Sequence, residues 1–473
     1  MTLPRLCLAC CLAFLSAAAR GQDPLPVPVP APAPTPVPTP EPGPDERPAP
    51  VEEPPPTQDP VPTLDETPPA AASPSPAPAD YARAWTEAEF EQELARLADS
   101  HASRLSVSEL GHSRGGRRIA LLTLGDRAGD PGRRPAALFV TDLAAHAADR
   151  PAGPEAALFA VRRLLERAEG EARVAELLAS VTLYAVPAPD PDGVFAPGGT
   201  LERTCRLERN FPAGWQPSDA IECPQGPYPC SEPETRELAR VVAQRTNVGA
   251  LALLARAPAG LWSAGTDSPS NAADPVLARV AARAGLELTQ LVRARDAAAA
   301  APGSLPAFAR ARTGACVLVL DPWSAPAPGP ESAPRGFESL PGAIEALLGE
   351  LPRLALRSPR TERLREKLWL VEVDLSVAGL LPTASPEERG KAPASVWLDA
   401  QGARVLRIGL GREGEPTTNL DVPRGPTWRV GHLAGAESVR LHLLVEGEAG
   451  GVLRLAFRSL RGAVVEADVG LSG

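Results

Sequence analysis

The stretch PAALFVTDLAAHAADRPAGPEAALFAVRRLLERA, residues 135–168, decides the fold class. It starts with a continuous apolar run, which is typical of a strand buried on both faces of a sheet. A loop follows, and from residue 154 the apolar residues recur at helical spacing. Strand, loop and helix in this order predict one unit of an α/β sheet. The loop places His146 and Asp149, three residues apart, shortly after the strand.

The same alternation continues on both sides of this stretch. We predict a mixed α/β sheet with helices on both faces, in which chemistry gathers at the carboxyl ends of strands. His146, Asp190, Arg256 and Asp321 all follow apolar runs. The predicted strands are residues 104–110, 117–125, 135–143, 181–186, 248–255 and 314–321, and the predicted helices are residues 86–102, 154–168, 231–245 and 274–288. Thr86 is the expected N-cap of the first helix.

The predicted α/β domain spans residues 81–355, and the segments before it have a different character. Residues 1–22 have the positive start, apolar core and small-residue end of a secretion signal, so we expect an exported protein. Residues 23–80 hold 23 of the 57 prolines and are expected to form a disordered, extended linker.

The last hundred residues alternate apolar and polar positions between glycine turns, which predicts a β-sandwich over residues 366–473. The charged stretch 356–367 shows no such pattern and is the expected boundary. No apolar run is long enough to predict a membrane-spanning helix.

Charge and cysteine content narrow the function classes. The formal net charge of −10 is concentrated in the proline-rich linker, and the rest of the chain is near neutral, so no nucleic-acid surface is expected. Four cysteines follow the predicted signal: Cys205, Cys223, Cys230 and Cys316. In an exported protein they permit a disulfide among the first three, whereas Cys316 lies in a predicted buried strand, either as a free thiol or in a bridge.

Six segments carry motifs of a known family. They are GHSRGGRRIALLTLG (111–125), HAADRPAGPEAAL (146–158), PDPDG (189–193), LERNFPAGW (207–215), GPYPCSEPETREL (226–238) and GSLPAFARARTGACVLVLD (303–321). In this order they resemble the zinc carboxypeptidases of the carboxypeptidase A type, over roughly residues 81–350. VAGLLPT (377–383) resembles a strand of β-sandwiches that follow such peptidases in some bacterial proteins.

This resemblance implies a metal site with specific departures from the family pattern. Family members hold zinc with two histidines and a glutamate, and a second glutamate acts as general base. His146 matches the first ligand, and Asp149 stands in the place of the glutamate. Asp321 stands in the place of the general base. Both aspartates are one carbon shorter than glutamate, which changes the reach of a site that needs near-contact geometry.

The second zinc histidine is missing. Residues 250–262 resemble the strand and loop that carry it, and the ligand position falls at Ala255 or Arg256. The chain has only five histidines, and none lies there. His112 is a remote alternative, because its predicted strand lies away from the site. The family's tyrosine between the second histidine and the general base is missing as well.

The anion-binding side of the family's site is partly present. Arg209 matches the arginine that binds the terminal carboxylate of a substrate. Glu208 precedes it and would repel that carboxylate, so an ion pair of Arg209 with Glu208 or another neighbour is the alternative. Arg203 or Arg206 could match the arginine that stabilises the oxyanion, and the spacing does not decide between them.

Without zinc, Asp149 and Asp321 would leave two like charges in one place. Arg256 could supply the missing positive charge. We therefore predict that His146, Asp149, Arg256 and Asp321 form a salt-bridged remnant of the metal site.

Three hypotheses about function remain. We prefer an exported, catalytically degenerate carboxypeptidase homologue that needs no cofactor and binds peptide C-termini or a cell-wall peptide. The second is an active zinc metallocarboxypeptidase with altered ligands. The third is a structural or adhesion protein that acts through its β-sandwich.

Overall fold

The structure is a computed structural model. It describes residues 81, 83–141, 143, 153–195, 205–217, 225–255, 260–262, 275–284, 302–321, 335–357, 359–389, 394–412, 415–420 and 427–472. Residues 76–473 form one compact unit. The predicted signal peptide and proline-rich linker lie outside the described residues.

A seven-stranded mixed sheet forms the middle of this unit, as the sequence predicts. The strands β3, β4, β5 and β7 pair in parallel, and the flanking strands pair antiparallel. All residues of β3, β4 and β7 are buried, which explains their uninterrupted apolar sequences. In sheet order the strands are β1 (Leu105–His112), β2 (Arg118–Leu124), β4 (Thr182–Val186), β3 (Ala136–Val140), β5 (Val248–Leu254), β7 (Cys316–Leu320) and β6 (Gly260–Trp262).

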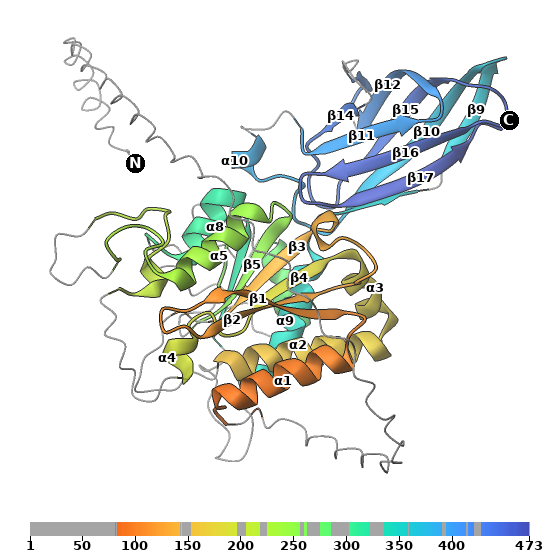
Figure 1. Cartoon of the computed structure of the whole chain (residues 1–473). Helices are drawn as coiled ribbons and strands as arrows, with labels where there is room; N and C mark the ends of the chain where they lie inside the picture. The colour runs from red at the N-terminus through yellow and green to blue at the C-terminus, as the bar shows by residue number, and fades with distance from the viewer. Residues whose placement is uncertain are drawn as a thin grey trace, which may run out of the picture. The chain divides into compact units, whose positions relative to one another are not determined.

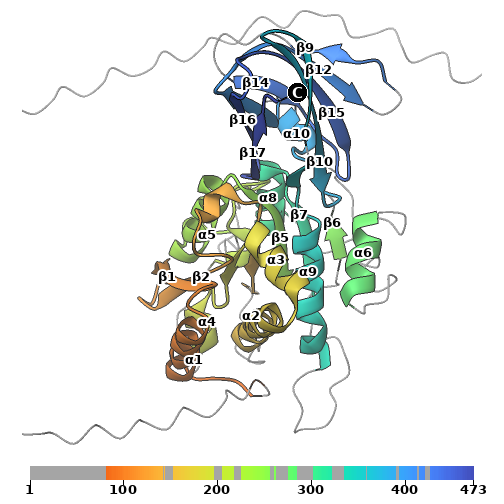
Figure 2. The same cartoon turned by 90° about the vertical axis from the view of Figure 1, so that its right-hand side faces the viewer.

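Helices cover both faces of the sheet, as Figures 1 and 2 show. One buried apolar cluster lies beneath α1 (Glu87–Ser100), α2 (Gly153–Gly170), α3 (Ala172–Ser180), α6 (Pro275–Ala284) and α9 (Leu340–Gly349). A second cluster lies on the opposite face, beneath α5 (Pro233–Gln244) and α8 (Leu305–Thr313). The short helices are α4 (Pro191–Phe195), α10 (Pro386–Arg389) and the 3-10 turns Pro131–Arg133, Leu207–Arg209 and Arg335–Ser339.

The predicted start of α1 is confirmed. The Thr86 side chain accepts a hydrogen bond from the backbone N–H of Glu89, and the Glu89 carboxylate accepts one from the backbone N–H of Thr86. This capping box satisfies donors that the first turn of a helix leaves unpaired.

The C-terminal region consists of two antiparallel sheets around one apolar cluster, which confirms the predicted sandwich-like architecture. The burial along β10 alternates residue by residue, as a strand with one buried face requires. One sheet contains β13 (Thr418–Asn419), β12 (Arg404–Arg412), β15 (Ser438–Glu446), β10 (Leu368–Ala378), β8 (Arg353–Leu356) and β9 (Arg360–Arg365). The other contains β14 (Thr427–Gly431), β11 (Val396–Gln401), β16 (Val452–Ser459) and β17 (Val464–Gly470).

The charged stretch 356–367 differs from the expectation of an unpatterned boundary. β8 and β9 both pair with β10, so the chain enters the C-terminal sheet at Arg353. Most residues of β9 are exposed. Its charged side chains therefore face water while its backbone joins the sheet, and the hydrophobic alternation that identifies a strand is missing.

One arginine of the C-terminal region is buried against the seven-stranded sheet. The Arg461 side chain is 3% exposed and donates hydrogen bonds to the carbonyl oxygens of Val248, at 2.8 Å, and Thr313. It also forms an ion pair with Glu388 at 2.7 Å. Val248 begins β5 and Thr313 ends α8, so Arg461 connects the C-terminal region to the amino-terminal edge of the parallel strands.

We predict that Arg461→Ala destabilises the whole unit. The substitution leaves two buried carbonyl groups unpaired and removes a charge-assisted contact, which costs about 3 kcal/mol. Urea unfolding of the variant and the parent chain measures the difference. Arg458→Ala is the matched control, because Arg458 is 52% exposed in its ion pair with Asp399, and exposed pairs contribute about 0–1 kcal/mol. Equal losses in both variants would contradict the anchoring role of Arg461.

Candidate functional site

The carboxyl ends of the parallel strands meet at one edge of the sheet. Ala255 and Asp321 are the first residues after β5 and β7, and the Ala255 N–H donates to the Leu320 carbonyl oxygen at 3.0 Å. Ala255, one of the two candidate positions for the family's second histidine, therefore lies beside Asp321. Ala255 has no atom that can bind a metal. Asp321 is partly buried.

The segment that carries His146 and Asp149 starts and ends at this edge. Thr141, directly after β3, donates from its hydroxyl to the Pro187 carbonyl oxygen at 2.9 Å. Gly153, the first residue of α2, packs against Thr141, because a Cβ added to it would lie 3.3 Å from the Thr141 Cβ. His146, Asp149, Arg203 and Arg256 lie outside the described residues, so the salt-bridged remnant remains a prediction.

The other four histidines do not lie at the ends of β3, β5 or β7. His101 follows α1 at the opposite edge of the sheet and contacts Glu169 at 2.8 Å. His112 ends β1, which is three strands from β3, or roughly 14 Å at the usual strand spacing. It is 55% exposed and contacts Glu109. The C-terminal region holds His432 and His442. Among the described residues, no three histidine, cysteine, aspartate or glutamate side chains form a group able to hold a metal ion.

Residues 207–213, here called the Arg209 segment, are hydrogen-bonded to Gly303, which lies just before α8. The Phe211 N–H donates to the Gly303 carbonyl oxygen at 2.7 Å, and the Gly303 N–H donates to Ala213 at 2.6 Å. Gly303 has a φ of +77°, and a Cβ there would collide with the Arg209 carbonyl oxygen. Only glycine permits this approach. α8 packs on the sheet and ends at Thr313, shortly before β7 begins at Cys316, so its N-terminus and the Arg209 segment lie toward the carboxyl ends of the parallel strands.

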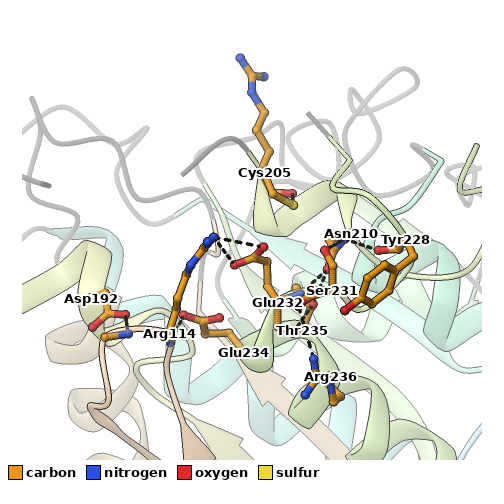
Figure 3. Close-up of polar contacts among 12 residues, drawn as sticks. Arg114, Asp192, Cys205, Asn210, Tyr228, Ser231, Glu232, Glu234, Thr235 and Arg236 are labelled. Atoms are coloured by element: carbon orange, nitrogen blue, oxygen red, sulfur yellow. Dashed lines mark hydrogen bonds and ion pairs between the residues drawn. The ribbon is translucent and has the colours of Figure 1, made fainter. Parts of the chain in front are cut away.

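Asn210 connects the Arg209 segment to residues 225–231 and to the start of α5 (Figure 3). Its amide nitrogen donates to the carbonyl oxygens of Gln225, at 2.7 Å, and Tyr228, at 3.0 Å, and to the Ser231 hydroxyl at 3.0 Å. Its amide oxygen accepts from the Glu232 N–H at 3.2 Å and from the Thr235 hydroxyl at 2.6 Å. Asn210 is fully buried, and these bonds attach residues 225–231 and the start of α5 to the Arg209 segment.

Arg209 itself is partly exposed. The structure records no ion pair between Arg209 and another described side chain, so the alternative of a pair with Glu208 finds no support among the described residues. The N-termini of α5 and α8 point toward the same edge, and their partial positive charge adds to the attraction of this edge for anions.

Three buried acidic groups contact the neighbouring β1–β2 turn, as Figure 3 shows. The Asp192 carboxylate accepts from the Gly115 N–H at 2.7 Å and from Arg117 at 2.8 Å, which raises the pKa of the Arg117 guanidinium. The Glu232 carboxylate accepts from the Arg114 guanidinium at 3.3 Å, and the fully buried Glu234 accepts from the Arg114 N–H at 3.0 Å. These contacts attach the β1–β2 turn to α4 and to the start of α5.

The structure describes three of the four cysteines that follow the predicted signal peptide. Cys230 forms no disulfide with a described cysteine, and burial raises the pKa of its thiol while Arg236 lowers it. Cys205 and Cys316 are buried, and Cys223 lies outside the described residues.

Sequence reasoning singled out Arg209 but not Asn210 or Gly303. Both occur in the quoted motifs, so the signal was present. Their importance comes from contacts with segments 15 to 92 residues away in the chain, which a motif alone does not reveal.

Comparisons with known proteins agree with this architecture. Residues 90–301 match the family model described as zinc carboxypeptidase, and residues 353–470 match a domain of unknown function (DUF8731). The middle part of this chain is therefore a domain of the zinc carboxypeptidase family. No curated protein matched the chain.

Solved carboxypeptidase structures are similar at low sequence identity. Carboxypeptidase A from Helicoverpa armigera is 15% identical, with a TM-score of 0.42, over 57% of this chain and 73% of that one. A metallo-carboxypeptidase from Burkholderia cenocepacia is 16% identical, with a TM-score of 0.39, over 56% and 69%. A metallo-carboxypeptidase from Pseudomonas aeruginosa is 20% identical, with a TM-score of 0.36, over 54% and 66%. Within the described residues, no helix has the length and apolar character needed to cross a membrane.

We predict that Asn210→Ala destabilises the protein by about 3 kcal/mol, because it leaves several buried donors and acceptors unpaired. Chemical unfolding measures the change. Asn419→Ala, at an exposed position of β13, is the matched control and should change the free energy of unfolding by less than about 0.5 kcal/mol. A small effect at Asn210 would show that residues 225–231 do not depend on it.

Proposed function

We propose that the carboxypeptidase-like domain binds the C-terminal end of a peptide and does not hydrolyse it. Arg209 is the group that would hold the terminal carboxylate. The observation that carries the proposal is its partly exposed position at the carboxyl edge, with no acidic partner among the described side chains. A charge-assisted bond to a carboxylate is stronger than one between neutral groups.

The residues of this edge do not fit the zinc chemistry of the family. At the second histidine position stand Ala255, which has no ligating atom, and Arg256, which stays protonated and only donates hydrogen bonds. Of the four other histidines, His101 and His112 precede His146 in the chain, and His432 and His442 belong to the C-terminal region. The family's own positions therefore supply one histidine instead of two, and the shorter Asp321 stands at the position of the general base. These features support binding without catalysis.

We further propose that the protein acts outside the cytoplasm. The signal-like residues 1–22 support export, and the proline-rich residues 23–80 have the composition of an extended spacer. A peptide C-terminus, including one from cell-wall peptide, is a ligand class present in that compartment.

Peptide binding tests the proposal. Isothermal titration of the full chain should show that a peptide with a free C-terminus binds at least about ten-fold more tightly than the same peptide with a C-terminal amide. Arg209→Ala should remove this preference. Arg312→Ala is the matched control, because Arg312 is exposed near the C-terminus of α8, at the opposite edge of the sheet. Equal binding of the acid and the amide would contradict the role of Arg209.

Zinc content tests the absence of the metal centre. After incubation with excess zinc and desalting, we expect well below one zinc ion per chain, because the family's ligand set is incomplete. A content near one, together with release of C-terminal amino acids from peptides, would support the active enzyme instead.

A further inference from the structure

Tyr228 is the most exposed large hydrophobic side chain among the described residues, at 55%. It lies in the sequence Gly-Pro-Tyr-Pro-Cys, residues 226–230. Exposed aromatic residues on a surface need no explanation by themselves. The backbone that carries the Tyr228 side chain is held by hydrogen bonds and prolines, so the position of the exposed ring is restricted.

Hydrogen bonds and local conformation restrict residues 225–231 throughout. The Tyr228 carbonyl oxygen accepts from the Asn210 amide at 3.0 Å and from the Ser231 N–H at 3.2 Å. The Gln225 carbonyl oxygen accepts from both Asn210 and the Trp215 indole, at 2.7 and 2.8 Å. Prolines on both sides of Tyr228 limit the backbone further.

The two ends of this segment adopt left-handed backbone conformations. Gly226 has a φ of +76°, and a Cβ there would lie 2.7 Å from the Asn210 amide nitrogen. Cys230 has a φ of +56°, which costs energy for a residue other than glycine. Its N–H donates to the Asn210 carbonyl oxygen at 2.7 Å, which stabilises that conformation.

This segment is attached directly to the proposed carboxylate site. The Asn210 side chain binds it, as Figure 3 shows, and Asn210 follows Arg209 in the sequence. A rigid tyrosine offers a large contact surface and loses little conformational entropy on binding. Arg236 is exposed, and its guanidinium donates to the Ser231 carbonyl oxygen of this segment at 3.3 Å. Its positive charge disfavours a cationic ligand side chain here, whereas the exposed Tyr228 ring offers a flat apolar surface to an aromatic one.

We propose that Tyr228 selects peptides with an aromatic side chain one or two residues before the C-terminal residue. This proposal rests on the proposed function, because Arg209 would set the position of the peptide. The ring of Tyr228 stacks on the ligand's ring, and the Asn210 network holds it in place without any rearrangement of the segment.

Two acetylated peptides test the proposal, Ala-Phe-Phe-Ala and Ala-Ala-Ala-Ala, each with a free carboxyl terminus. Isothermal titration of the full chain should show about five-fold tighter binding of the first. Tyr228→Ser should remove that preference without changing the affinity for the alanine peptide, and Tyr228→Phe should keep it. Leu364→Ser, at another exposed hydrophobic position, should have no effect.

The outcomes separate this proposal from the proposed function. If Arg209→Ala weakens both peptides and Tyr228→Ser leaves the aromatic preference intact, the role of Tyr228 is overturned and carboxylate binding stands. If the parent chain binds neither peptide, both proposals are overturned. An unchanged melting temperature of Tyr228→Ser verifies that the loss is one of contact, because the side chain is largely exposed.

Discussion

The buried amide of Asn210 is the interaction on which the candidate site depends. It is a neutral group that uses both donor and acceptor atoms, so it can be fully buried without an unpaired charge. It joins the Arg209 segment to residues 225–231 and to the start of α5, which follows them directly in the chain. Without it, each segment would have to satisfy its backbone groups separately, and Arg209 would have no defined position relative to Tyr228.

The contacts with the C-terminal region and the candidate site lie at opposite edges of the seven-stranded sheet. At the amino-terminal edge of the parallel strands, Arg461 donates to the backbone at the start of β5 and at the end of α8. Glu350, which follows α9 and is fully buried, accepts from the Leu380 N–H at 3.0 Å. The C-terminal region is therefore bound to the sheet at that edge. At the carboxyl ends of the parallel strands the sheet is followed by loops, whose side chains can change without loss of the core.

This separation allows residues at the carboxyl ends of the parallel strands to differ while the fold is retained. The core of β3, β5 and β7 depends on apolar side chains, which remain in this chain. Ala255 lies just beyond the end of β5, and its small side chain belongs to the edge of the buried cluster. Its N–H bonds to the Leu320 carbonyl oxygen, so the backbone path at the end of β5 does not depend on the identity of this side chain.

The amino-acid sequence alone was sufficient for the sheet, its helices and the family. Apolar runs such as residues 136–140 and 316–320 can only be buried, and burial at this density requires a covered parallel sheet. It also shows that no histidine stands at the two candidate positions for the family's second ligand, Ala255 and Arg256. It did not reveal β9, whose charged residues lack alternation, because backbone pairing with β10 rather than side-chain burial forms that strand. Only the tertiary structure decided that Asn210 holds Tyr228 beside the Arg209 segment, because hydrogen bonds between distant segments depend on three-dimensional proximity and leave no periodic pattern in the chain.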